Sequence, residues 1–185
     1  MALVIMVAVA FVVVGILGTV VGIYNHLVHL RFNTDKAWAN IDVILKQRRD
    51  ELPKLVDTCK GYMKYEQALL DKLTAARTAF LSASTADEKV KAENEISRGL
   101  KSLFAVAENY PDLKANQGFF QLQGRISSLE NSISDRRELF NESVNLYNVK
   151  INQFPDMLLV GMMGYTQKQL LEIPAEETKD VKIDL

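Results

Sequence analysis

The stretch that decides the fold is residues 2–24, ALVIMVAVAFVVVGILGTVVGIY, which contains no charged side chain. As an α-helix this stretch is about 35 Å long, enough to cross a hydrocarbon core of about 30 Å with some tilt. A cleaved signal peptide has a shorter apolar stretch, which follows a positively charged segment. We therefore predict a retained, single-pass transmembrane anchor over residues 1–25.

A G-x-x-x-G motif lies within this predicted anchor, at Gly18 and Gly22. Glycines one helical turn apart leave a flat strip on which a second helix packs closely. Gly18 and Gly22 are therefore candidate contacts between copies of the chain, and we expect a homo-oligomer in the lipid bilayer.

The basic residues that could set the topology all follow the anchor. They are Arg31, Lys36, Lys46, Arg48 and Arg49. Because cytoplasmic flanks of membrane helices carry an excess of Lys and Arg, this distribution predicts a soluble domain in the cytoplasm.

The remainder of the chain shows helical periodicity from residue 26 to residue 154 and no strand pattern. Four apolar stripes recur at steps of mostly three and four residues. Their members are Trp38, Ile41, Leu45, Leu52, Leu55, Cys59 and Tyr62; Leu69, Leu70, Leu73, Ala76 and Phe80; Val90, Ile96, Leu100, Leu103, Phe104 and Ala107; and Phe119, Leu122, Ile126, Leu129, Ile133, Phe140, Val144, Tyr147, Ile151 and Phe154. Residues 26–155 therefore predict an all-α fold, an antiparallel four-helix bundle of long amphipathic helices.

Polar and proline-containing segments separate the stripes. Residues 82–87, SASTAD, predict a turn that contains an N-cap, and Pro111 ends the third stripe. Pro53 is ambiguous, because it either kinks one long helix or begins a new one.

The final segment, residues 156–185, is apolar and rich in methionine at first and charged later. Met162 and Met163 are candidate contact residues, since methionine adapts to irregular surfaces. Packing on the bundle is favoured over packing on a partner or on the membrane surface. The last residues, Val181–Leu185, alternate like a short strand that could pair with a partner's sheet edge.

The composition argues against several kinds of chemistry. With 22 basic and 23 acidic residues the net charge is −1, so we expect no nucleic-acid partner. The single cysteine, Cys59, lies on an apolar stripe and is interpreted as a small buried hydrophobic residue. Both histidines, His26 and His29, lie beside the anchor, which removes the Glu-x-x-His pairs that di-metal helical bundles use. We predict no catalytic residues, no cofactor and no metal.

Two polar segments remain as candidate interaction sites. They are Arg48, Arg49 and Asp50 in the first stripe, and Tyr110, Pro111 and Asp112 between the third and the fourth. The first group is either a set of solvated ion pairs, which is favoured, or a docking patch. The second is an exposed turn, and loops carry function more often than scaffolds do. In the last stripe, Arg136 falls where an apolar residue is expected and could pair with a carboxylate across the bundle.

The sequence resembles the LemA family of bacterial membrane proteins along almost its whole length. The motifs that carry the resemblance are Trp38-x-x-Ile41-Asp42-Val43, Leu52-Pro53, Lys60-Gly61-Tyr62 and Tyr110-Pro111-Asp112-Leu113-Lys114-Ala115, followed by Tyr147-Asn148 and Phe154-Pro155. The resemblance implies a helical bundle on one anchor in the bacterial inner membrane, and it supplies no enzymatic activity.

Some members of this family act in magnetosome membranes, and others are encoded beside membrane zinc metalloproteases. We therefore expect a non-enzymatic, membrane-anchored scaffold or adaptor that assembles through its anchor and bundle faces. The alternative is an accessory or regulatory partner of a membrane protease or another membrane complex.

Overall fold

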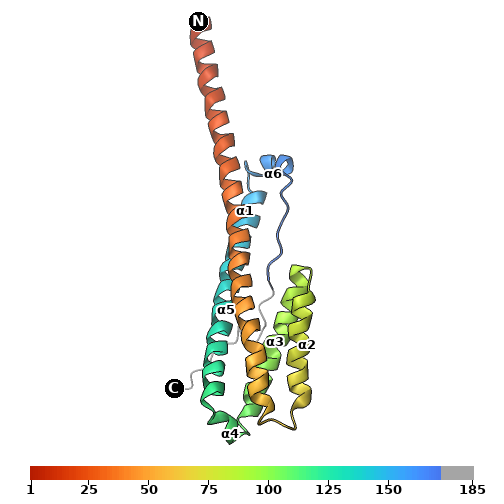
Figure 1. The fold of residues 1–185 in the computed structure, drawn as a ribbon. Coiled ribbons are helices and arrows are strands. Elements are labelled where there is room, and N and C mark those ends of the chain that lie inside the picture. Colours follow the sequence, from red (N-terminus) through yellow and green to blue (C-terminus); the bar gives the residue numbers. More distant parts are fainter. Residues whose placement is uncertain (172–185) are drawn as a thin grey trace, which may run out of the picture. The chain divides into compact units, whose positions relative to one another are not determined.

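The computed structural model describes residues 1–171, apart from the side chains of residues 86 and 87, and every regular element in this part is a helix (Figure 1). The helices are α1 (Ala2–Lys60), α2 (Gln67–Ser82), α3 (Ala86–Ala107), α4 (Pro111–Lys114), α5 (Gln117–Asn152) and α6 (Met157–Met163). The all-α prediction is confirmed. The prediction of a strand at Val181–Leu185 and the charged tail lie outside the described residues.

The chain forms two compact units. The N-terminal unit consists of Met1–Ala39 and Glu138–Leu170, and the central unit is built from Asn40–Arg137. Both α1 and α5 contribute to each unit. The division predicted at residues 25 and 155 stays a prediction, and α1 runs from the apolar stretch to Lys60 without a break.

Pro53 neither ends α1 nor begins a new helix, and the first reversal of the chain comes after Lys60. A proline has no N–H, so the carbonyl four residues earlier, that of Arg49, loses its donor within the helix. The Nε of Arg77 in α2 donates to this carbonyl at 3.4 Å. The neighbouring helix thus replaces the donor that Pro53 removes.

The central unit contains the predicted apolar core. Segments of α1, α2, α3 and α5 contribute it, and they follow one another through short connections, as the predicted antiparallel bundle requires. Gly99 allows α3 to approach α2 closely, since a Cβ at this position would lie 2.7 Å from Cδ2 of Leu73. The buried apolar residues include Ile41, Leu45, Leu52, Leu55, Cys59, Leu70, Leu73, Phe80, Ile96, Leu100, Leu103, Phe119, Ile126 and Ile133.

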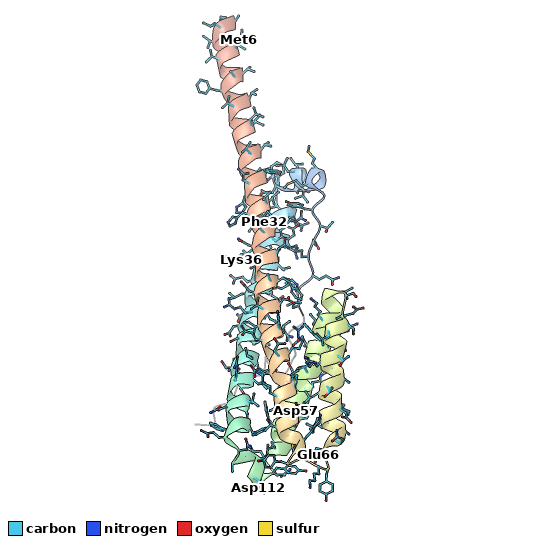
Figure 2. All side chains as sticks on the ribbon, in the orientation of Figure 1. Met6, Phe32, Lys36, Asp57, Glu66 and Asp112 are labelled. Carbon is cyan, nitrogen blue, oxygen red and sulfur yellow. The ribbon has the colours of Figure 1, made fainter. Side chains whose placement is uncertain are left out.

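The N-terminal unit has a smaller core of Leu27, Tyr147 and Ile151. Residues of α6 and the segment after it pack against this core, so the predicted packing of the apolar C-terminal segment on the chain's own helices is confirmed. No other part of residues 1–171 covers the apolar stretch of α1, and Figure 2 shows the side chains around Met6 projecting from the helix.

The turn between α2 and α3 contains the predicted N-cap, which is Thr85. The backbone N–H of Glu88 donates to Oγ1 of Thr85 at 3.2 Å, and Oε2 of Glu88 accepts from the backbone N–H groups of Ser84 and Thr85 at 2.8 and 3.1 Å. This is a capping box, in which the side chains satisfy the unpaired donors at the start of a helix.

Replacing Thr85 with alanine removes the accepting hydroxyl from this box. We expect Thr85→Ala to lower the free energy of unfolding by about 1 kcal/mol, a typical cost of losing an N-cap. Urea titration of the detergent-solubilised chain, followed by circular dichroism, measures the change. Thr78→Ala is the matched control, because the Thr78 hydroxyl donates to the carbonyl of Thr74 within α2 and caps no helix end. An equal loss in the control would contradict a capping role.

The same capping box makes the stability of the folded chain depend on pH. The backbone hydrogen bonds from Ser84 and Thr85 hold the pKa of Glu88 below its ordinary value. Since the folded chain favours the carboxylate, this contribution to stability is present above the ordinary pKa and is lost as pH falls through the lowered one. The stability difference between the native chain and Glu88→Gln should therefore shrink in acid, and a constant difference would contradict this assignment.

Candidate functional site

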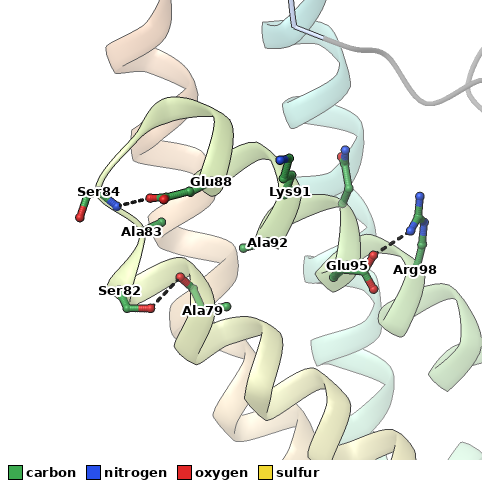
Figure 3. Close-up of a pocket in the computed structure, with 10 residues that line it drawn as sticks. Ala79, Ser82, Ala83, Ser84, Glu88, Lys91, Ala92, Glu95 and Arg98 are labelled. Carbon is green, nitrogen blue, oxygen red and sulfur yellow. Dashed lines mark hydrogen bonds and ion pairs between the residues drawn. The ribbon is translucent and has the colours of Figure 1, made fainter.

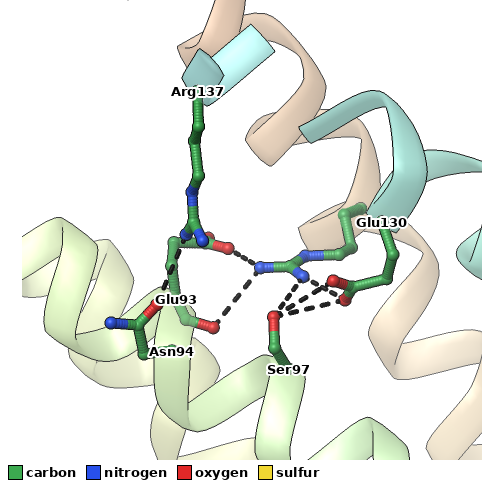
Figure 4. A network of polar contacts seen from close by, with 6 residues as sticks. Glu93, Asn94, Ser97, Glu130 and Arg137 are labelled. Atoms are coloured by element: carbon green, nitrogen blue, oxygen red, sulfur yellow. Dashed lines mark hydrogen bonds and ion pairs between the residues drawn. The ribbon is translucent and has the colours of Figure 1, made fainter. Parts of the chain in front are cut away.

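Arg48 is the centre of a buried polar cluster in the central unit. Its side chain is 0% exposed, and its guanidinium forms ion pairs with Glu93 of α3 and Glu130 of α5 (Figure 4). The favoured interpretation of Arg48 as a solvated residue is therefore wrong. This part of α1 is covered by α3 and α5, so the charge is paired across the core instead of along the helix.

Ser97 completes the cluster. Its Oγ accepts a hydrogen bond from Nη1 of Arg48 at 2.8 Å and donates to Oε2 of Glu130 at 3.1 Å. The backbone carbonyl of Glu93 also accepts from Nη2 of Arg48, at 3.4 Å. Arg48, Glu93, Ser97 and Glu130 are called the polar centre below. They join α1, α3 and α5.

Two further polar contacts flank the polar centre. Glu51, buried on α1, pairs with Arg125 of α5 at 3.1 Å and with Lys54 at 3.1 Å. Arg137 of α5 is 4% exposed, and its Nη2 donates to Oδ1 of Asn94 at 3.4 Å. These contacts tie α5 to both α1 and α3, although the Arg125 side chain itself is mostly exposed.

The polar centre has a signal in the sequence. The first apolar stripe steps seven residues from Leu45 to Leu52, and Arg48 fills the missing core position. Glu130 and Arg137 occupy the equivalent positions between Ile126, Ile133 and Phe140. Arg48 and Arg137, which fill gaps in the apolar stripes, are buried, and Glu130 is half-buried.

Arg136 was expected in this seam, and that expectation is wrong by one residue. Arg136 is exposed and Arg137 is buried. The stripe was followed through Leu129, which is half-buried, whereas the regular step of four and three runs through Glu130 and Arg137.

The polar centre offers little that could react. A groove of about 390 Å³ beside it is lined by Ser97, Lys101, Phe104, Glu130, Asn131 and Ser134, among others. Glu130 is the one carboxylate in this lining, and Arg48 already neutralises it. A serine nucleophile needs an adjacent base that is free to take its proton, and the Glu130 carboxylate is already engaged by Arg48 and Ser97.

Arg49 and Asp50 do form the expected pair of neighbouring charges, with Nε of Arg49 3.8 Å from Oδ1 of Asp50. The Arg49 guanidinium also lies 5.4 Å from the ring centroid of Phe80 in α2. Arg49 therefore covers an aromatic residue of the core, while Asp50 is mostly exposed.

The segment at Tyr110, Pro111 and Asp112 forms the start of α4. Pro111 occupies the first turn of the helix, where its missing N–H costs no hydrogen bond, and Pro111 and Asp112 are exposed. The Tyr110 hydroxyl donates to Oε1 of Glu66 at 3.5 Å, and desolvation together with this carboxylate raises the pKa of Tyr110. Figure 2 shows Glu66 and Asp112 at the same end of the central unit.

Gly18 and Gly22 lie on the exposed part of α1, where a Cβ built on either would meet no atom within 4 Å. Met162 is 86% exposed, whereas Met163 packs against the core of the N-terminal unit. The two methionines therefore differ in exposure, since Met163 is half-buried. Both methionines belong to the N-terminal unit, whereas the charged candidates belong to the central unit.

A shallow cavity of about 730 Å³ lies at the turn between α2 and α3 (Figure 3). Its charged lining residues include Glu88, which caps α3, and Glu95 and Arg98, which pair at 2.7 Å. Within residues 1–171 no group of three or more His, Cys, Asp or Glu side chains is arranged to hold a metal ion.

These features define a class of protein: a helical protein with one N-terminal helix that is long and apolar enough to cross a membrane, and a polar centre that serves packing. A model of the LemA family matches residues 37–185. The chain belongs to the LemA family, as its motifs indicated. The LemA family is not known for enzymes, and neither are the MamQ proteins, which include relatives of this chain.

Three relatives are similar to the chain. The protein LemA of Metamycoplasma hominis is 30% identical over 137 residues, which cover 72% of this chain and 62% of that protein. The magnetosome protein MamQ 2 of Paramagnetospirillum magneticum is 22% identical over 193 aligned positions, with 90% and 71% covered. The magnetosome protein MamQ of Magnetospirillum gryphiswaldense is 28% identical over 88 residues, with 47% and 32% covered. The chain thus spans less than two thirds of the Metamycoplasma protein.

Removing the guanidinium of Arg48 leaves the Glu93 carboxylate buried without its cation. We expect Arg48→Met to lower the free energy of unfolding by about 3–5 kcal/mol, the usual cost of breaking a buried pair on one side. Urea unfolding of the full chain in detergent, followed by circular dichroism, measures the loss.

Two variants make this test specific. Arg136→Met removes an exposed arginine from α5 and should change stability by less than about 0.5 kcal/mol. Adding Glu93→Gln to Arg48→Met removes the stranded charge and should restore part of the stability. Equal effects of the two single arginine variants would contradict the role of the polar centre.

Cys59 is buried, as expected, and desolvation raises its pKa to about 11. Because the thiolate is the reactive form, we expect iodoacetamide at pH 8 to modify Cys59 slowly in the folded chain and rapidly in urea. Tyr65→Cys places a second thiol at a position that is 93% exposed, and it should react quickly under both conditions. Similar rates at the two thiols of the folded chain would show that Cys59 is accessible.

Proposed function

We propose that the chain is a non-enzymatic, membrane-anchored scaffold that assembles copies of itself through the apolar part of α1, with its central unit in the cytoplasm. The observation that carries this proposal is the uncovered state of that helix. Its most apolar window of 18 residues has a mean hydropathy of 3.0, and none of the window is buried. So much exposed apolar surface requires a bilayer, other helices, or both.

One face of this helix suits close contact with a second copy. Gly18 and Gly22 are open to their surroundings, and the Thr19 hydroxyl donates to the carbonyl of Gly15 at 2.9 Å. The one polar side chain near the glycines is therefore already satisfied within α1. A second helix could approach the glycine backbone without having to supply a hydrogen bond.

The central unit supports a scaffold role through its chemistry. Its buried cation Arg48 is paired with two carboxylates in the polar centre, and the exposed residues Pro111 and Asp112 at the start of α4 leave a surface that a partner could contact. The resemblance to proteins named as magnetosome proteins supports a role at a membrane.

The test is the assembly state of the full chain in phospholipid vesicles, measured by energy transfer between copies labelled with donor and acceptor at decreasing protein-to-lipid ratio. We expect a specific oligomer for the native chain, and we expect Gly18→Leu combined with Gly22→Leu to shift it towards monomers at the same ratio. The added side chains hold the two backbones apart.

Val13→Phe is the matched control, because it adds bulk to the same helix at about 140° from Gly18. It should leave the oligomer unchanged. A native chain that is monomeric at densities found in membranes, or a control that dissociates the oligomer as strongly as the glycine variant, would overturn the proposal.

A further inference from the structure

The short helix α6 has two apolar faces, and the part of the chain that the structure describes covers one of them. Leu159, Val160 and Met163 pack against the core of the N-terminal unit. On the other side Met157 is 52% exposed, Leu158 is 64% exposed and Met162 is 86% exposed. Unlike an ordinary surface helix, α6 therefore presents no polar side chain on its open face.

A cavity of about 400 Å³ lies between α6 and α1. It is lined by Val20, Val21, Tyr24, Leu159, Met162 and Met163. Five of these six side chains are wholly apolar, and Tyr24 alone carries a polar group. Since Val20–Tyr24 is the end of the uncharged stretch of α1, α6 lies where that stretch would leave the hydrocarbon core.

Hydrogen bonds on the C-terminal side hold α6 in this place. The Asn148 side chain forms two hydrogen bonds with the backbone of Lys168, at 2.8 and 2.9 Å, and the Tyr147 hydroxyl donates to the carbonyl of Thr166 at 3.1 Å. Gly164 ends the helix in the left-handed conformation, with φ of 64°. The segment that follows α6 is therefore fixed to α5 within the N-terminal unit.

Aromatic and basic groups lie near α6 in the N-terminal unit. The Arg31 guanidinium lies 4.9 Å from the ring centroid of Tyr165, just beyond α6, and Tyr24 borders the cavity. Tyrosines sit at the level of lipid headgroups, where one end of the ring is apolar and the other is wet. Arginine beside them suits the phosphate of a headgroup.

We propose that α6 is a second membrane contact: its open face of Met157, Leu158 and Met162 lies in the interfacial layer of the bilayer that anchors α1, and lipid acyl chains fill the cavity. The occupant is lipid because the open face continues the apolar surface of the anchor at its membrane-exit end. Helices that lie in the interface bury their apolar face by about 5–10 Å. This inference rests on the anchoring of α1 but not on its self-assembly.

The experiment places an environment-sensitive fluorophore on Met162→Cys in the full chain, reconstituted into vesicles of phosphatidylcholine and phosphatidylglycerol. Some of the lipids carry a nitroxide near the top of the acyl chain, and iodide is the aqueous quencher. The unsubstituted chain is the blank, because Cys59 is buried. Leu139→Cys, on α5 of the same unit and 49% exposed, is the matched control.

The expected result is quenching of the label at Met162 by the lipid nitroxide several-fold more strongly than that at Leu139, with the reverse order for iodide. Equal quenching at both sites would overturn the proposal. Protection of Met162 from both quenchers would also overturn it, in favour of contact with a protein. A label on Val12→Cys tests the anchor separately, because its failure to respond to the lipid quencher would contradict anchoring of α1 itself.

Discussion

The central unit depends on one constraint, the burial of the Arg48 guanidinium in the middle of α1. A buried cation without partners costs several kcal/mol, so the fold must bring carboxylates to it. Glu93 and Glu130 come from different helices, and Ser97 accepts from one of the guanidinium nitrogens while donating to Glu130. Arrangements of α1, α3 and α5 that do not place these four residues at one level are excluded.

This constraint matters because apolar stripes alone do not fix how helices are aligned. Leucine and isoleucine recur every three or four residues, so sliding one helix by a heptad replaces each apolar contact with a similar one. A buried polar group removes this degeneracy, as polar core residues do in coiled coils. The Arg77 side chain acts similarly on α2, because its hydrogen bond to the Arg49 carbonyl is available only at the turn that Pro53 opens. Specificity, more than net stability, is what such groups contribute.

Sequence reasoning succeeded where the determinants are local. The stripes predicted the helices, and residues 82–87 predicted the cap at Thr85, because periodicity and capping involve residues a few positions apart. It missed the polar centre, whose partners are 45 and 82 residues apart in the chain. The gap between Leu45 and Leu52 marks Arg48 as a core residue, but no local pattern identifies which carboxylates complete it. For the same reason, the sequence identifies single candidate interaction residues but does not predict which of them lie together in space.

The N-terminal unit differs from the central unit, since none of residues 1–171 covers its largest apolar surface. In residues 26–35, which follow the apolar stretch, polar side chains form hydrogen bonds within the chain. Thr34, which is 0% exposed, donates to the Arg31 carbonyl at 2.7 Å and accepts from Nζ of Lys168 at 2.5 Å. Nζ also lies 2.5 Å from Oδ1 of Asp35. Burying a hydroxyl is tolerable only with such partners. The change from an uncovered apolar helix to one with paired polar groups therefore occurs within α1, between the apolar stretch and Thr34.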